Sequence, residues 1–240
     1  MIDVLYILRN APSSNNDDEI RYSLRSLDKF CPDVARVFLT GGMPSFIDER
    51  KVVYTPADDI GVPAINHWWK VKETIERTDI SEDFILMYDD VFFVKESPLS
   101  AYPLFYRGEL TNEKNENNLY ELTLYATRKL LEQMKKPTLD FCLHTPIRYN
   151  GQRFIEMTKH FEPLIDETPT LSVRSFYGNA FTDFEQNKVF REDIKIRSCL
   201  EKVKDVIGDA DCFSVSDDVF QCDTICYLVK NFPNKSRWEK

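Results

Sequence analysis

Glycine is scarce in this sequence, with 7 residues among 240. The chain contains neither a G-x-G-x-x-G segment nor a Walker lysine loop, which disfavours dinucleotide enzymes of the Rossmann type and P-loop kinases. A G-x-S-x-G nucleophile elbow is also absent. With so little glycine, the chain has little material for a loop that binds phosphate through its backbone.

Long hydrophobic runs and paired cysteines are missing too. No apolar run approaches the ~20 residues that span a bilayer, and the opening residues, MIDVLYILRNAPSS, lack the basic and apolar regions of a signal peptide. We therefore expect a cytoplasmic protein with no membrane span. The six cysteines include no C-x-x-C pair, which argues against a zinc ribbon, and we expect six free thiols.

Basic residues are fewer than acidic ones: 31 Lys and Arg stand against 40 Asp and Glu, so the net charge is −9. This balance argues against broad non-specific binding to nucleic acid, although it leaves room for a local basic groove. Hydrophobic residues make up 42% of the chain, enough for a sizeable core, and the length suits one large α/β domain.

The hydrophobic pattern predicts a series of strands and helices. Strands are expected at 3–8, 36–40, 51–54 and in the run 83–94, and helices at 19–30, 63–78, 121–135 and 152–160. Residues 137–149 are expected to be extended, 174–184 to mix aromatic and turn residues, and 217–232 to end in a helix. The order indicates a βαβ-type half that binds a nucleotide.

The segment from Phe84 to Val94 contains the sharpest chemical signal. An apolar run ends in Asp89 and Asp90, and the carboxyl ends of strands are where open α/β sheets bind ligands. Adjacent carboxylates suit Mg²⁺ or Mn²⁺, which bridges one or two protein oxygens to substrate phosphates. The alternative is a surface turn in which one aspartate caps the next strand.

Histidine occurs three times. His144 follows an apolar stretch and precedes Thr145-Pro146, so it is a candidate general base or metal ligand. The alternative is a half-buried structural histidine. His67 precedes two tryptophans and is expected to pack, and His160 is expected at a helix C-terminus.

Arginines are the expected phosphate ligands, since the guanidinium fork matches phosphate oxygens. Arg21, Arg25 and Arg148 are candidates, and Arg21 and Arg25 are four residues apart, hence on one helix face. The alternative for Arg25 is an exposed helix charge.

Two segments resemble the Stealth family, which contains bacterial capsular-polysaccharide phosphotransferases and the lysosomal-enzyme GlcNAc phosphotransferase. They are DDEIRYSLRSLDKFCPDVARVFLTGGMPSFI (residues 17–47) and SEDFILMYDDVFFVKE (residues 81–96). The family has an ELRYSLRS-like helix, a VFIV-type strand and an apolar strand ending in NDDVFF. LHTPIRY (143–149), SVSDD and FPNKSRWEK resemble later family segments more loosely, so the likeness touches most of the chain.

The first strand departs from the family pattern. Stealth phosphotransferases open with a strand of the DVVYTWVDG type, whose aspartate belongs to the active site. Here the matching stretch is DVLYILRNA, with Arg9 and Asn10 in place of the acidic turn, and Tyr88 stands where the family has asparagine. The departure favours a GT-A-type glycosyltransferase, and Arg9 is then a further candidate for contacting the nucleotide.

The resemblance implies a GT-A-like α/β fold, with residues 1–110 as the nucleotide-sugar-binding half and 111–240 as the acceptor-side and C-terminal part. It implies that Asp90 binds the metal, that Asp89 binds the ribose or the metal through water, and that His144 is a second ligand or the acceptor-side base. The expected reaction is transfer of a sugar from a nucleotide sugar, with a UDP-sugar as the expected donor. The acceptor is a glycan or, as a minority expectation, a hydroxymethylated base in phage DNA. The alternatives are a hexose-1-phosphate transferase and an inactive nucleotide-sugar-binding module.

Overall fold

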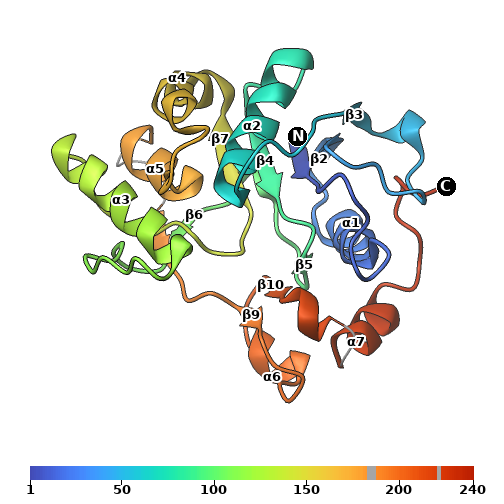
Figure 1. Cartoon of the computed structure of the whole chain (residues 1–240). Helices are drawn as coiled ribbons and strands as arrows, with labels where there is room; N and C mark the ends of the chain where they lie inside the picture. The colour runs from blue at the N-terminus through green and yellow to red at the C-terminus, as the bar shows by residue number, and fades with distance from the viewer. Residues whose placement is uncertain (183–187, 221–222) are drawn as a thin grey trace.

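The computed structural model describes residues 1–182, 188–220 and 223–240. Its main sheet has five strands in the order β3-β2-β1-β4-β7 (Figure 1). The first four are parallel, and β7 is antiparallel to β4. Their bounds are β1 Ile2–Ile7, β2 Val34–Thr40, β3 Val53–Thr55, β4 Asp83–Met87 and β7 Ile147–Asn150. The expected strands of the first half are therefore confirmed.

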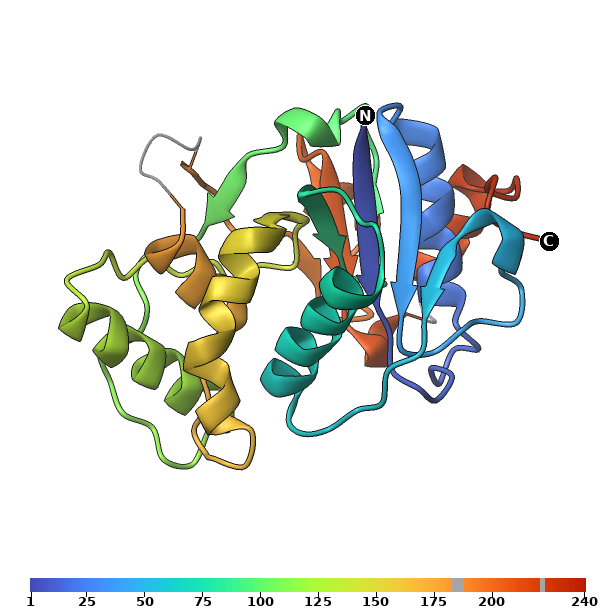
Figure 2. The ribbon, with the colours of Figure 1, turned by 90° about the horizontal axis from the view of Figure 1, so that it is seen from above.

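Helices cover both faces of this sheet (Figure 2). The expected helices form with small shifts at their ends, namely α1 Asp18–Phe30, α2 Pro63–Arg77, α3 Leu119–Gln133 and α4 Gly151–Phe161. Pro63 stands at the start of α2, where its fixed φ suits the first helical turn. Two further helices, α5 (Val173–Ala180) and α6 (Val203–Ile207), were not expected, and α7 spans Asp223–Asn231.

The two faces of the sheet belong to two hydrophobic clusters, because successive side chains of a strand point to opposite sides. Leu5 of β1 packs in the cluster of α2, α4 and α5, whereas Val4 and Tyr6 pack in the cluster of α1. Every residue of β1 except Ile7 is buried, as expected of a parallel strand with helices on both sides.

Smaller sheets attach the rest of the chain to this core. β5 (Val91–Phe93), β10 (Cys212–Val215) and β9 (Lys195–Ile196) form one sheet in the order β5-β10-β9, and β6 (Leu104–Tyr106) pairs with β8 (Lys188–Phe190). Short 3₁₀ helices lie at Glu49–Lys51, Leu99–Ala101, Glu162–Leu164 and Asp217–Val219. In these small sheets, strands from the second half of the chain join β5 and β6 of the first half: β10 pairs with β5, β9 with β10, and β8 with β6.

The cysteines correct one expectation. Cys31, Cys142, Cys212 and Cys226 are free, but Cys199 is disulfide-bonded, so six free thiols is wrong. Cys222 lies outside the described residues. In the described part of the chain, none of the helices combines the length and the hydropathy needed to cross a bilayer.

Candidate active site

The aspartate pair lies at the point where the strand order reverses. The chain passes from β1 to β2 and β3 on one side, while β4 pairs with β1 on the other side. The segments that leave the carboxyl ends of β1 and β4 therefore diverge, and such a crevice is the usual ligand site of an open α/β sheet. Leu8 and Arg9 follow β1 at this crevice, and Asp89 and Asp90 follow β4.

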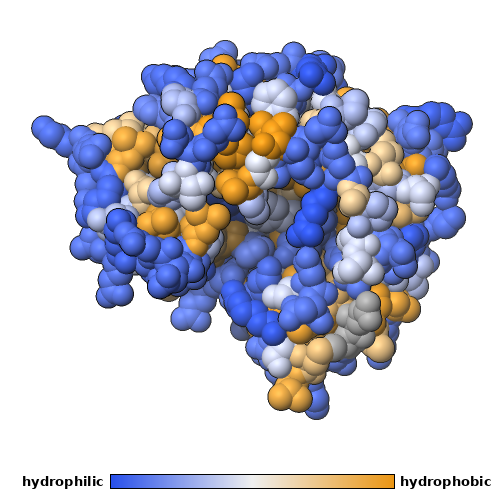
Figure 3. Space-filling model, in the orientation of Figure 1, coloured by the Kyte–Doolittle hydropathy of each residue, from blue (hydrophilic) through white to orange (hydrophobic). Residues whose placement is uncertain are grey.

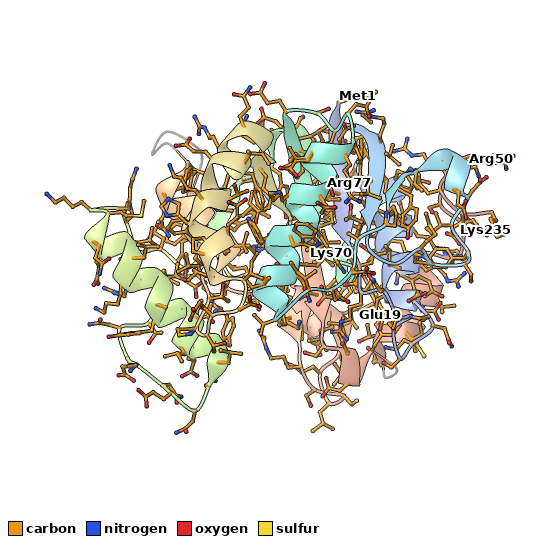
Figure 4. The ribbon with its side chains drawn as sticks, turned by 45° about the horizontal axis from the view of Figure 1, so that its top comes forward. Met1, Glu19, Arg50, Lys70, Arg77 and Lys235 are labelled. Carbon is orange, nitrogen blue, oxygen red and sulfur yellow. The ribbon has the colours of Figure 1, made fainter. Side chains whose placement is uncertain are left out.

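A glycine allows the neighbouring segments to approach closely. Gly41, just after β2, has a φ of +106°, and an added Cβ would lie 2.1 Å from the carbonyl oxygen of Leu8. Lys70 of α2 reaches the same place, where its Nζ donates to the Leu8 carbonyl oxygen (2.5 Å) and to Asp59 Oδ1 (2.6 Å). Figure 4 labels Lys70 on α2 beside the sheet. These contacts fix the end of β1, next to the aspartates.

A cavity of about 800 Å³, which we call the main cavity, opens at this point. Figure 3 shows the face of the molecule hollowed near its centre, with hydrophobic residues beside the depression. Four of the residues suggested by the sequence line the cavity: Arg9, Asp89, Asp90 and His144. Its size fits a small-molecule ligand.

A smaller cavity of about 260 Å³, the side cavity, adjoins the first on the β2 side. Arg9, Asp89, Asp90 and Asp217 line both cavities. Glu19 of α1 contributes to the side cavity only (Figure 4). The aspartate pair therefore lies where the two cavities meet.

The two aspartates differ in their surroundings. Asp90 forms an ion pair with Lys195, at 3.1 Å between Nζ and Oδ2. Burial raises the pKa of Asp89 to about 7, and the negative charges of Asp90 and Glu19 add to the shift. In the described part of the chain no cation pairs with Asp89, so the protein supplies no direct counter-charge for this carboxylate.

The carboxylates at this junction fit a divalent cation. Asp89 and Asp90 are hard oxygen donors, and the negative charge at Asp89, which has no cation partner among the described residues, attracts a cation. Across residues 1–182, 188–220 and 223–240, no cluster of three or more His, Cys, Asp or Glu could hold a metal. Mg²⁺ does not require one, since it commonly takes one or two protein carboxylates and completes its shell with water and phosphate.

His144 lies in the wall of the main cavity beside Asp193. The His144 backbone N–H donates to Asp193 Oδ1 (3.1 Å), and its Nδ1 lies 3.6 Å from Asp193 Oδ2. Burial alone would raise the pKa of Asp193, but hydrogen bonds from His144 and the charge of Arg197 bring that pKa below its ordinary value. A charged Asp193 therefore faces the imidazole. The sequence does not predict the His144–Asp193 contact, because the two residues are 49 positions apart and lie on separate loops.

His67 is a structural residue of the core, as its tryptophan neighbours suggested. Its Nδ1 lies 3.2 Å from the Tyr88 hydroxyl, and its Nε2 lies 3.1 Å from the Tyr149 hydroxyl. Burial lowers the pKa of His67 to about 3, and the positive charge of Arg174 adds to the shift. His67 is therefore neutral and ties α2 to β7 and to the residue before Asp89.

Three arginines suggested by the sequence do not line either cavity. Arg25 forms a bidentate pair with Glu239: its Nε donates to Oε1 (2.8 Å) and its Nη2 donates to Oε2 (2.9 Å). Arg21 pairs with Asp18, and Arg148 pairs with Asp83 at the opposite end of β4 from the aspartate pair. The structure thus separates these arginines from Asp89 and Asp90.

Sequence reasoning did not identify several charged residues of the main cavity. Lys70, Arg174, Asp193 and Lys195 all line it, as does Asp217, which lies in the SVSDD segment noted for its likeness to the Stealth family. That likeness was the only available signal. Lys195 and Asp90 are 105 residues apart in the sequence, and no local pattern predicts such a pair.

Comparison with known proteins agrees with the resemblance seen in the sequence. No protein-family model matches the chain. An exopolysaccharide phosphotransferase of Nocardia farcinica is 24% identical over 268 residues, covering 93% of this chain and 53% of the relative. The exopolysaccharide phosphotransferase CpsY of Mycobacterium leprae is 31% identical over 102 residues, 39% of this chain and 18% of the relative. The chain therefore spans at most about half the length of these curated relatives.

Solved structures show the fold. The galactosyltransferase LgtC, in complex with donor and acceptor sugar analogues, has a TM-score of 0.52 at 8% identity, covering 98% of both chains. An active-site mutant of LgtC gives a TM-score of 0.53 at 7% identity over the same shares. The expected mixed α/β, GT-A-like fold is confirmed. The chain is thus similar in sequence to exopolysaccharide phosphotransferases of the Stealth type and has the fold of a GT-A glycosyltransferase.

Proposed function

We propose that this chain is a metal-dependent glycosyltransferase that moves a sugar from a nucleotide-sugar donor to a glycan acceptor. The observation that carries the proposal is the position of Asp89 and Asp90. They follow β4 at the crevice between β1 and β4, in a GT-A-like fold, where two cavities meet. The side cavity would take the nucleoside, and the main cavity the sugar and the acceptor.

Asp90 and Asp89 would hold a Mg²⁺ or Mn²⁺ ion on the donor diphosphate. Such an ion would neutralise charge on the leaving group. The protein's own part is to keep these carboxylates in place. Lys195 bonds to Asp90, and Lys70 anchors the adjacent end of β1 through the Leu8 carbonyl. The uncompensated charge at Asp89 supports this assignment.

His144 would act as the acceptor-side base. Asp193 Oδ2 lies 3.6 Å from its Nδ1, which has no other partner in the described part of the chain, and a carboxylate that closes to hydrogen-bond distance there would orient the imidazole and stabilise its protonated form. His144 also lines the main cavity, where the acceptor hydroxyl would bind. The other role, a second metal ligand, is less favoured, because the described residues contain no group of three His, Cys, Asp or Glu side chains that could hold a metal.

Transfer of a sugar phosphate is the second candidate, favoured by the names of the curated relatives. Arg9 and Asn10 after β1 count against it, since the resemblance places an acidic active-site turn there. Arg9 is exposed and lies 3.6 Å from Asp217. The two reactions leave different products, because glycosyl transfer releases a nucleoside diphosphate and sugar-phosphate transfer releases a nucleoside monophosphate.

The deciding experiment screens nucleotide sugars by thermal shift with and without Mn²⁺, since a ligand of the native state raises the melting temperature. Mass spectrometry then identifies the nucleotide product formed from the donors that bind. We expect a diphosphate such as UDP, whereas UMP would establish the second candidate. Binding without any turnover would indicate an inactive nucleotide-sugar-binding module instead.

The matched variants are Asp90→Asn and Asp83→Asn. Asp90 follows β4, whereas Asp83 is the first residue of β4, where it pairs with Arg148 outside the cavities. Loss of one carboxylate that stabilises the leaving diphosphate should cost about 3 kcal/mol of barrier, or roughly 100-fold in rate. Asp83→Asn should keep the wild-type rate. Equal rates for Asp90→Asn and wild type would refute the assignment of the aspartate pair.

A further inference from the structure

Arg174 is a buried arginine with one nitrogen left unpaired. It lies near the start of α5, is 4% exposed, and contributes to the wall of the main cavity. Its Nε donates to the Phe141 carbonyl oxygen (3.0 Å) and its Nη2 donates to the Thr145 carbonyl oxygen (2.8 Å). Its Nη1 is buried and has no hydrogen-bond partner in the described part of the chain. Two carbonyls thus hold the guanidinium in place while one donor remains unused.

The other cations of the main cavity each have a carboxylate partner. The pairs are Arg9 with Asp217 (3.6 Å), Lys70 with Asp59 (2.6 Å), Arg107 with Asp140 (2.7 Å), Lys195 with Asp90 (3.1 Å) and Arg197 with Asp193 (2.7 Å). Among the residues that the structure describes, Arg174 takes part in no such ion pair. The ring of Tyr88 also faces the charge, with its centroid 5.3 Å from the guanidinium carbon.

A buried charge without a counter-charge is costly, and a buried donor without an acceptor adds to the cost. Among residues 1–182, 188–220 and 223–240, Arg174 has no carboxylate partner and its Nη1 has no acceptor within hydrogen-bond distance, so a bound anion would supply both. The guanidinium also packs on Tyr88, which directly precedes Asp89. An anion held by Arg174 would therefore lie in the main cavity close to the aspartate pair.

We propose that Arg174 is an anion-binding residue of the main cavity and takes a phosphate or carboxylate group of the bound substrates. The guanidinium presents several donors in one plane and suits both groups. Two kinds of ligand could carry this anionic group. One is the donor, through its diphosphate, and the other is the transferred sugar or the acceptor, through a negatively charged substituent. Only the identity of the ligand rests on the proposed function, because the unpaired guanidinium selects an anion whatever the reaction.

The test measures binding of inorganic phosphate and pyrophosphate by calorimetry, without nucleotide or metal and at constant ionic strength set with NaCl. The proteins are wild type, Arg174→Met, Arg174→Lys and the control Arg148→Met. Arg148, like Arg174, donates to a backbone carbonyl oxygen, but it pairs with the carboxylate of Asp83 and lies outside both cavities. We expect Arg174→Met to weaken anion binding at least about tenfold, the size of a lost hydrogen bond to a charged group. Arg148→Met should bind as wild type does.

Three further probes separate the two sources of the anion: UDP, glucose 1-phosphate and glucuronate. Weaker UDP binding by Arg174→Met assigns the anion to the donor diphosphate. Normal UDP binding with weaker binding of glucose 1-phosphate or glucuronate assigns it to the transferred group or the acceptor. Both results support the proposal. If no anion depends on Arg174 by more than twofold, Arg174 only holds the two carbonyls and the proposal is overturned.

Folding is checked by circular dichroism and thermal melting. Arg174→Lys keeps the charge and carries the test if Arg174→Met does not fold. If neither variant folds, wild type decides: binding at a site should raise the melting temperature with a saturable dependence on phosphate at constant ionic strength, whereas the general stabilising effect of phosphate rises without saturation. The absence of a saturable rise would overturn the proposal. A chain that binds phosphate through Arg174 but never turns over a nucleotide sugar would refute the proposed function and leave this inference standing.

Discussion

Replacing His67 with glutamine removes a titratable group that the folded protein keeps uncharged. The imidazole is buried between the hydroxyls of Tyr88 and Tyr149, and Arg174 adds a nearby positive charge. Burial lowers the pKa of His67 to about 3, whereas an exposed histidine titrates at about 6.5. The two tyrosines and the arginine that face it do not titrate between pH 5 and 8, so the imidazole alone changes charge there.

The sign of the effect follows from proton binding. Below pH 6.5 the unfolded chain protonates His67 and the folded protein does not, so acid favours unfolding. Each pH unit corresponds to about 1.4 kcal/mol once the unfolded imidazole is fully charged. At pH 5 His67 should therefore lower the free energy of unfolding by about 2 kcal/mol relative to pH 8. This penalty should continue to grow as the pH falls toward about 3, where the folded protein also takes up the proton.

The assay is urea unfolding of wild type and His67→Gln at several pH values between 8 and 5, followed by tryptophan fluorescence. Glutamine keeps one donor and one acceptor for the two tyrosine hydroxyls but does not titrate. Carboxylates contribute equally to both proteins, so the difference between them isolates His67. We expect His67→Gln to gain about 2 kcal/mol on wild type between pH 8 and pH 5. A difference that stays constant within about 0.5 kcal/mol would refute the buried, neutral imidazole.

Three other substitutions test the packing and the site. Gly178→Ala in α5 would place a Cβ 2.5 Å from Cδ2 of Phe141, so urea unfolding should show a loss of about 1–3 kcal/mol. Arg25→Met would leave the 3%-exposed Glu239 with Arg21 at 4.0 Å and the donors of Ser236, and should cost about 1.5–3 kcal/mol in the same assay. His144→Gln should lower the maximal rate at saturating Mn²⁺ if it is the base, and shift the metal midpoint if it is a ligand. Changes below about twofold in both would make His144 structural.

The aspartate pair was predictable because its signal is local. An apolar run interrupted by two carboxylates specifies a buried strand, a polar turn and a second strand within one short segment, and β4 and β5 form as expected. The parallel sheet followed in the same way from the spacing of strands and helices. Local patterns of this kind survive folding because neighbouring residues in the sequence remain neighbours in the structure.

Helix α5 was missed because its sequence, VRSFYGNA, has few good helix formers. Contacts from elsewhere stabilise it. The Ser175 hydroxyl accepts from the Phe141 N–H, and Gly178 admits the Phe141 ring, which would lie 2.5 Å from an added Cβ. Since α5 also positions Arg174, the anion-binding residue could not be recognised before these distant contacts were known.

Arg148, four residues after His144, was a candidate phosphate ligand because a guanidinium matches phosphate oxygens. Strand direction decides otherwise. β7 runs antiparallel to β4, with Arg148 opposite Ile85 and Asn150 opposite Asp83, so the chain moves away from Asp89 as it leaves His144. The sequence contains nothing that sets this direction. A residue's distance along the chain is therefore a poor guide to its distance from a site that several strands build together.

The register of the small sheet explains how the site is completed. Asp90 directly precedes β5, where Val91 pairs with Ser214 of β10, and Ser214 pairs in turn with Lys195 of β9. This row of three residues brings Lys195 to Asp90. The same segment carries Asp193 to His144. A shift of β9 by one residue would turn Lys195 to the other face of its sheet and remove the ion pair. The aspartate pair thus joins two sheets, and its charge balance depends on strand pairings that only the folded chain defines.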